Sequence, residues 1–164
     1  SDRGQLREPR DLAVTPEGNI VVCDKGNHRM QVFKPDGTAY FSFGSMGEFE
    51  GHFKHPCGVA VGPEGCIVVA DSGNARVQVF DRDGGFVRLF GSRGDEQGKF
   101  QSPDGIAVSP QGDIVVSDWR LARINIFRDN GDFVQAFGAG GDGEGEFKGP
   151  AGLAVSTNGS VVVA

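Results

Sequence analysis

The chain has 164 residues, of which 22 are acidic and 16 are basic, so its formal net charge is −6 at pH 7. This balance argues against a generic basic nucleic-acid binder. No apolar run approaches the roughly 18 residues that a membrane span needs, and the first ten residues lack the apolar core of a signal peptide. We therefore expect no membrane partner.

Three cysteines, Cys23, Cys57 and Cys66, are present, and none lies in a C-x-x-C spacing. An odd number cannot pair completely within one chain, so a disulfide scaffold and a cysteine zinc site are both disfavoured. We expect neither a metal nor a cofactor. Unpaired cysteines also favour a reducing compartment, which makes the cytoplasm the expected location.

A period of 47 residues organises the whole chain. It is carried by the series Pro9, Pro56, Pro103 and Pro150, and by Gly18, Gly65, Gly112 and Gly159. The units run over 5–51, 52–98 and 99–145, with a partial fourth unit at 146–164, and together they form one domain, 1–164. Repeats of this length are typical of propellers and solenoids.

Each unit contains four strand signals, which in the second unit are GVAV at 58–61, CIVVAD at 66–71, RVQVF at 76–80 and FVRLFG at 86–91. They are rich in valine, isoleucine and phenylalanine, and glycine-containing turns join the first to the second and the third to the fourth. The pattern predicts an all-β chain of four-stranded antiparallel blades. Three full blades and two strands of a fourth give a β-propeller.

Two series of large apolar residues follow the period. Phe43, Phe90 and Phe137 end the fourth strands, whereas Leu6, Phe53, Phe100 and Phe147 each precede the periodic proline by three residues. We expect both series to pack between neighbouring sheets.

At Asp24–Phe33 (DKGNHRMQVF) and Asp71–Phe80 (DSGNARVQVF) the sequence resembles the NHL repeat. The length and spacing look most like the C-terminal propellers of tripartite-motif (TRIM-NHL) ubiquitin ligases and related translational repressors. That resemblance implies a propeller that recognises proteins or single-stranded RNA and performs no chemistry. Any ligase activity would lie in domains outside this chain.

Three units and part of a fourth are too few to close a ring of the kind that the resemblance implies. The favoured expectation is that the chain is a piece of a longer propeller. The alternative is that two or more copies complete a ring by self-assembly through exposed strand edges.

One acidic and one basic residue recur where the second strand ends and the third begins. They are Asp24 with Arg29, Asp71 with Arg76, and Asp118 with Arg123. A carboxylate and a guanidinium across a short loop can form a charge-assisted bridge, and recurrence in every unit predicts a structural ion pair rather than a catalytic site.

The loops between the second and third strands and the connectors between blades open at the same end of a propeller. Their variable residues should therefore share a face, namely Arg10, Lys25, His28, His55, Cys57, Ser72, Asp104, Trp119, Arg120 and Leu121. The third unit departs most from the others, because Trp119-Arg120-Leu121 replaces the small KGN and SGN. Trp119 is either a partner contact or a cap that folds down on a blade.

We expect this face to bind a protein or peptide partner of basic or mixed charge through Arg10, Lys25, His28, His55, Trp119, Arg120 and Leu121. Single-stranded RNA on the same face is the alternative, although the acidic connectors show no basic groove in this part of the ring. A lyase-like propeller enzyme is disfavoured. None of His28, His52 and His55 falls on the segments expected to line the channel, and no catalytic set is visible.

Overall fold

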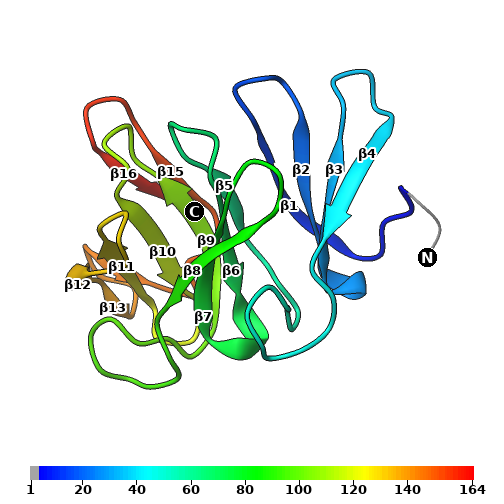
Figure 1. The fold of residues 1–164 in the computed structure, drawn as a ribbon. Coiled ribbons are helices and arrows are strands. Elements are labelled where there is room, and N and C mark those ends of the chain that lie inside the picture. The colour runs from blue at the N-terminus through cyan, green and yellow to red at the C-terminus, as the bar shows by residue number, and fades with distance from the viewer. Residues whose placement is uncertain (1–3) are drawn as a thin grey trace.

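The computed structural model describes residues 4–164 and shows an open arc of β-sheets (Figure 1). None of its described helices has the length and apolar character that crossing a membrane requires. Within residues 4–164, regular helix is limited to two single 3-10 turns, η1 (Lys25–Asn27) and η2 (Ser72–Asn74).

Three four-stranded antiparallel sheets and one two-stranded sheet form the arc, each with its strands in chain order. Blade 1 contains β1 (Pro9–Val14), β2 (Ile20–Asp24), β3 (Arg29–Phe33) and β4 (Ala39–Phe43). Blade 2 contains β5 (Val59–Val61), β6 (Ile67–Asp71), β7 (Arg76–Phe80) and β8 (Phe86–Phe90). Blade 3 contains β9 (Pro103–Val108), β10 (Ile114–Asp118), β11 (Arg123–Phe127) and β12 (Phe133–Phe137). The partial blade contains β15 (Leu153–Val155) and β16 (Val161–Val163).

The first strands of successive blades lie side by side, with β1 against β5, β5 against β9, and β9 against β15. This order puts the first strand of each blade on the inside of the arc, as in a propeller. Within a blade the register is set by tight turns. Gly65, for example, has φ +82° in the turn that leads into β6, a conformation that glycine adopts without strain. The predicted propeller fold is confirmed.

Two apolar cores fill the spaces between blades. Phe53 and Phe100 are fully buried, one in the core between blades 1 and 2 and the other in the core between blades 2 and 3. Their rings lie 5.4 Å from Phe80 and 5.6 Å from Phe127, respectively. The prediction of packing between sheets is correct for these two residues.

The ends of the arc leave members of the same series exposed. Leu6 is 39% exposed and Phe137 is 40% exposed. The expectation that every position of the two series is buried is thus wrong for these residues, because no second sheet within the described residues covers them.

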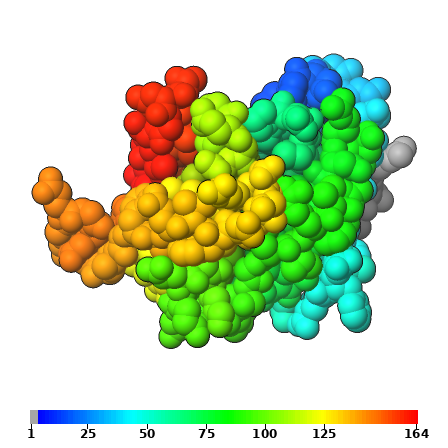
Figure 2. Space-filling model, turned by 60° about the vertical axis from the view of Figure 1, so that its left-hand side comes forward, coloured from blue at the N-terminus to red at the C-terminus, as the bar shows by residue number. Residues whose placement is uncertain are grey.

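Each connector between blades folds back on itself through a short parallel pairing. Met46 pairs with Phe53 and Arg93 with Phe100, and the third connector forms β13 (Ala139–Gly140) and β14 (Glu146–Phe147). The third connector, drawn in orange in Figure 2, projects from the body of the arc. The one-dimensional pattern did not predict this parallel element.

The periodic arginine holds the preceding connector. The Arg76 guanidinium donates to the carbonyl oxygens of Glu48, Phe49 and His52 at 2.8 to 2.9 Å. The equivalent arginine in blade 3, Arg123, donates to the three equivalent carbonyls, those of Asp95, Glu96 and Lys99. This arrangement, the arginine clamp, uses the fork of donors that only arginine provides.

The recurring ion pair forms in blades 1 and 2. Arg29 Nε lies 2.8 Å from Asp24 Oδ2, and Arg76 Nε lies 2.8 Å from Asp71 Oδ2, with both carboxylates fully buried. In blade 2, Asn74 also donates to Asp71 Oδ2 at 2.8 Å, so that the loop and the arginine share one carboxylate.

The predicted pair between Asp118 and Arg123 is wrong. Asp118 instead accepts the backbone N–H groups of Gln101, Ser102, Arg120 and Leu121. The Nε of Arg123 is buried and has no hydrogen-bond partner in the described part of the chain.

The physical reason lies in the third loop. Leu121 stands where the other units have asparagine and supplies no amide to the carboxylate, and Arg120 replaces the glycine that forms the 3-10 turn. Trp119 N–H now donates to the Ser102 carbonyl at 3.0 Å, whereas Gly26 and Gly73 make the corresponding bonds in the other units. The loop is therefore rebuilt around Asp118, and the arginine keeps only its clamp on the connector.

Candidate functional site

A hollow of about 620 Å³ lies at the end of the arc where the loops between second and third strands open. We call it the end-face hollow. Its lining includes eight of the ten residues that the sequence places on this face, namely Arg10, Lys25, His55, Cys57, Ser72, Asp104, Trp119 and Arg120. Residues from all three complete blades thus converge on one concave surface.

The other two residues lie outside the hollow. His28 stands behind His55, whose backbone N–H donates to His28 Nδ1 at 3.0 Å, and the two rings are 4.5 Å apart. Leu121 contributes nothing to the lining. His28 therefore positions His55 in the wall of the hollow. Leu121 affects only the conformation of its own loop, where it replaces the asparagine of the other units.

Sequence reasoning missed five further lining residues, which are Glu8, Gly73, Arg93, Gln101 and Ser102. Arg93 lies in a connector, but its guanidinium reaches the Gly73 carbonyl at 3.1 Å. Glu8 and Ser102 directly precede the residues that begin β1 and β9. Their position one step before a periodic proline was the available signal.

The hollow is locally basic in an acidic chain. Arg10, Lys25, Arg93 and Arg120 line it, against the carboxylates of Glu8 and Asp104. None of the acidic connector residues from Glu48 to Glu146 that suggested an acidic face is among the lining residues. The expectation that no basic groove exists in this part of the ring is thus corrected, because those carboxylates lie elsewhere on the connectors.

Asp104 is the buried acidic element of the hollow. Its side chain is 10% exposed and lies 3.7 Å from the Arg10 guanidinium, which is 54% exposed. One of the four cations therefore has a carboxylate partner, and Lys25 and Arg120 carry no ion pair among the described residues. The free cations make the hollow suited to a negatively charged ligand group.

Trp119 is placed both to contact a partner and to cover a neighbouring segment, which are the two alternatives that the sequence left open. It is 54% exposed, and it lines the hollow beside Arg120. Its indole also lies directly over Gly149, where an added Cβ would collide with Nε1 and the neighbouring ring carbons. One edge of the ring therefore covers the next connector, and the remainder is available for contact.

Burial and the neighbouring His55 lower the pKa of His28 below its ordinary value of 6.5. Neutral Nδ1 is the acceptor of the His55 N–H bond, and protonation removes it. The pKa of His28 is thus lower in the folded than in the unfolded chain. Neutral His28 therefore contributes its full share to the free energy of unfolding above pH 6.5, and this share is lost as the pH falls through the lowered pKa.

We expect acid to destabilise the wild-type chain more than a His28→Asn variant between pH 7.5 and pH 5. Asparagine tolerates the left-handed backbone at this position, where φ is +54°, and its amide oxygen accepts a bond without titrating. Urea unfolding at both pH values measures the difference. Identical pH dependence in the two proteins would contradict a role for His28 titration.

Among residues 4–164, no group of three or more histidine, cysteine, aspartate or glutamate side chains is placed to hold a metal ion. His52 lies apart in a connector, with its ring against Phe49. Burial raises the pKa of the Cys57 thiol, so the thiol in the hollow wall is disfavoured as a thiolate nucleophile. The hollow thus offers binding groups, and its surroundings do not activate Cys57.

The sequence model of the NHL repeat matches residues 6–33 and 53–80. Protein brain tumor from Drosophila melanogaster is 42% identical over 45 residues, which cover 27% of this chain and 4% of that protein. The B-box type zinc finger protein ncl-1 from Caenorhabditis elegans is 50% identical over 38 residues, covering 23% of this chain and 4% of that protein. The matched segments are thus a small part of these relatives.

Solved structures share the fold at low identity. Hydrazine synthase from Kuenenia stuttgartiensis superimposes with a TM-score of 0.73 at 18% identity, covering 97% of this chain and 42% of that one. Virginiamycin B lyase from Staphylococcus aureus gives 0.71 at 12% identity, covering 94% and 48%. A gluconolactonase from Xanthomonas campestris gives 0.70 at 19% identity, covering 98% and 55%. The chain spans about half the length of these structures, and the similarity concerns the fold alone.

Proposed function

Because this chain carries NHL repeats in propeller blades and is most like the TRIM-NHL proteins, we propose that it is a non-enzymatic recognition platform whose end-face hollow binds a macromolecular partner. The observation that carries the proposal is the convergence of variable-loop residues from three blades on one concave, locally basic surface. Residues shared between units build the frame, and residues that differ line the hollow.

The leading partner is an acidic segment of a protein or peptide. Four cationic side chains against two carboxylates favour negative charge, and exposed arginine beside tryptophan is typical of residues that dominate binding energy at protein interfaces. The sequence alone favoured a basic or mixed partner because the whole chain is acidic. The local charge of the hollow reverses that preference.

Single-stranded RNA is the second candidate, and Trp119 is the observation that favours it. Its half-exposed ring could stack on an unpaired base while Lys25 and Arg120 contact phosphates. RNA binding of this kind depends steeply on salt, because each neutralised phosphate releases counterions.

We expect Trp119→Ala combined with Arg120→Ala to weaken partner binding by about thirtyfold, as for the loss of a central interface contact. Thermal stability should stay close to that of the wild type, because Arg120 is exposed and about half of the Trp119 surface is already in solvent. Fluorescence anisotropy with a labelled acidic peptide and with a labelled single-stranded RNA, each over a salt series, measures the change.

A matched control replaces an exposed aromatic residue and an exposed arginine that do not line the hollow. Tyr40→Ala with Arg128→Ala meets this condition, and we expect binding to be unchanged. Equal losses in the two double variants would overturn the assignment of the hollow. A large loss of stability with intact binding would show that Trp119 serves only to cover Gly149.

A further inference from the structure

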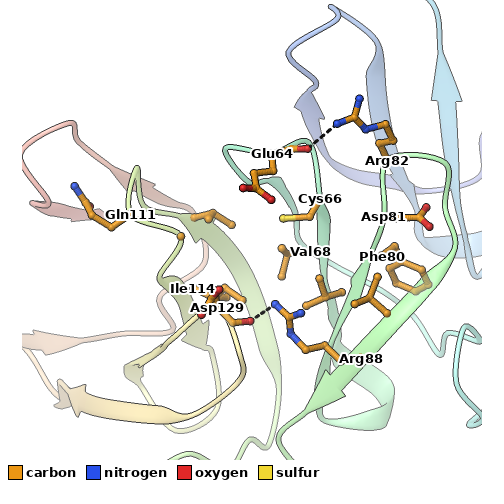
Figure 3. Close-up of a pocket in the computed structure, with 14 residues that line it drawn as sticks. Glu64, Cys66, Val68, Phe80, Asp81, Arg82, Arg88, Gln111, Ile114 and Asp129 are labelled. Carbon is orange, nitrogen blue, oxygen red and sulfur yellow. Dashed lines mark hydrogen bonds between the residues drawn. The ribbon is translucent and has the colours of Figure 1, made fainter.

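Gaps open between neighbouring blades at the end of the arc away from the end-face hollow. The gap between blades 2 and 3 holds a cavity of about 420 Å³, whereas the corresponding gap between blades 1 and 2 holds about 220 Å³. We call the larger one the interblade cavity, and Figure 3 shows it. Its volume falls in the range of sites that bind small molecules.

Two of the substitutions between the units replace aromatic rings in the lining of the gap. Phe41 in the first gap corresponds to Arg88 in the second, and Tyr40 corresponds to Val87. The Phe41 ring packs against the core between blades 1 and 2. Arginine in its place reaches the Asp129 carbonyl across the second gap, where no aromatic ring fills the space.

The floor of the interblade cavity is apolar. Val68 and Val79 of blade 2 and Ile114 of blade 3 line it, and all three side chains are at most 2% exposed. These three side chains are already out of water, so the apolar surface left for a ligand lies on the exposed Val87 and the half-buried Cys66 and Val108, which also line the cavity.

Arg88 supplies a polar anchor beside this floor. It donates through Nη2 to the Asp129 carbonyl across the gap, as the dashed line in Figure 3 marks. Its Nε is buried and has no hydrogen-bond partner among the described residues, so it is not the atom that a ligand would reach. The Asp129 carbonyl takes one of the five guanidinium donors, and the outer nitrogens have donors left for a ligand acceptor group.

We propose that the interblade cavity binds a small apolar molecule with a single carboxylate head, with the head on Arg88 and the body on Cys66, Val87 and Val108. The guanidinium pairs more strongly with a carboxylate than with a neutral acceptor. This site is separate from the end-face hollow and does not depend on its function.

Charges at the mouth restrict the ligand further. Glu64 and Asp129 line the cavity near the turns, and Glu64 is exposed. The Asp81 carboxylate is already bonded to the N–H groups of Asp83 and Gly85. Arg82 also lines the mouth, but its guanidinium already donates to the Glu64 carbonyl and lies 3.8 Å from the Glu17 carboxylate. A ligand with several negative groups would therefore meet one engaged cation and the carboxylates of Glu64 and Asp129, so the charges favour a single carboxylate head.

Cys66 provides a reporter inside the cavity. It is half-buried and lines the wall, whereas Cys23 and Cys57 are buried and their thiols have raised pKa values. Alkylation by N-ethylmaleimide should therefore occur first at Cys66. A Cys66→Ser variant identifies its share of the signal.

The test compares three probes of similar length, octanoate, 1-octanol and octylamine, as protectors of Cys66 in the wild-type chain. We expect octanoate to bind at least about tenfold more tightly than 1-octanol, because the charged head gains the bond to Arg88. Near saturation it should slow alkylation about tenfold, in proportion to the unoccupied fraction. Octylamine as the strongest protector would overturn the proposal, since the acidic mouth would then select the ligand.

Two variants separate the anchor from the cavity. Arg88→Met keeps the length and removes the donors, so octanoate should fall to the affinity of 1-octanol. Arg88→Phe restores the residue type of the first gap, so neither probe should change the alkylation rate. Thermal melting confirms that each variant is folded, and Trp119→Ala serves as a distant control with unchanged protection. Equal protection by octanoate in the wild type and both Arg88 variants would disprove the site.

Discussion

Asp71→Ala is expected to lower the free energy of unfolding by about 3 to 5 kcal/mol, the cost of removing one partner of a buried ion pair. Asp71 is fully buried, and its Oδ2 accepts bonds from Arg76, Asn74 and Gln78. Its Oδ1 accepts the Lys54 backbone N–H at 2.8 Å. The substitution would leave a guanidinium, two amides and a backbone donor without their acceptor.

Urea unfolding measures this effect, and Asp36→Ala is the matched control. Asp36 is also bonded to its loop, through the N–H and hydroxyl of Thr38, but it is exposed, so we expect a loss of less than about 1 kcal/mol. A double variant with Arg76→Met should recover part of the loss, because it removes the stranded charge. An Asp71→Ala protein with the wild-type urea midpoint would show that the buried pair contributes nothing.

Phe100→Ala is expected to cost about 3 to 5 kcal/mol, as for other fully buried aromatic residues. The ring is 0% exposed, lies 5.6 Å from the Phe127 ring and covers Gly91 at the end of β8. The ring packs directly against the Gly91 backbone, and glycine has no side chain that could relax into the space that the substitution leaves. The cavity would thus persist between blades 2 and 3.

Phe147→Ala tests the same position of the repeat where burial is incomplete. Phe147 covers Gly138 in the same manner, but it is only half-buried. We expect it to lose less than half of what Phe100→Ala loses, since most of the cost comes from buried surface. Differential scanning calorimetry of both variants provides the comparison. Equal losses of stability would mean that the ring stabilises the protein through its contact with the connector glycine rather than through burial in the core.

The strands could be predicted closely because each is bounded by residues with a strong local preference. RVQVF at 76–80 is β7, and FVRLFG at 86–91 ends one residue later than β8 because Gly91 takes a left-handed conformation. The connectors could not be predicted, because their parallel pairings join residues with no alternating pattern of their own. The arginine clamp likewise contacts main-chain carbonyls, which leave no mark in the sequence.

The face of the candidate site was predictable, and its charge was not. Antiparallel topology alone places the loops that follow β2, β6 and β10 at one end, so Lys25, Ser72 and Trp119 had to meet there. The sign of the hollow depends on which side chains point inward, and the net charge of −6 sums residues on every surface. The failure of the Asp118 and Arg123 pair has a similar origin, since Leu121, two positions before Arg123, removes the side-chain amide that donates to the carboxylate in the other two units.

The arginine clamp explains why the repeat keeps a constant length. Arg76 reaches the carbonyls of residues 48, 49 and 52 at once, and these oxygens are in range only for one spacing along the connector. An inserted or deleted residue would pull at least one carbonyl away from a largely buried guanidinium. The connectors can therefore accept substitutions of their side chains more readily than insertions or deletions. New binding surfaces would then arise on this scaffold by substitution at a constant repeat length.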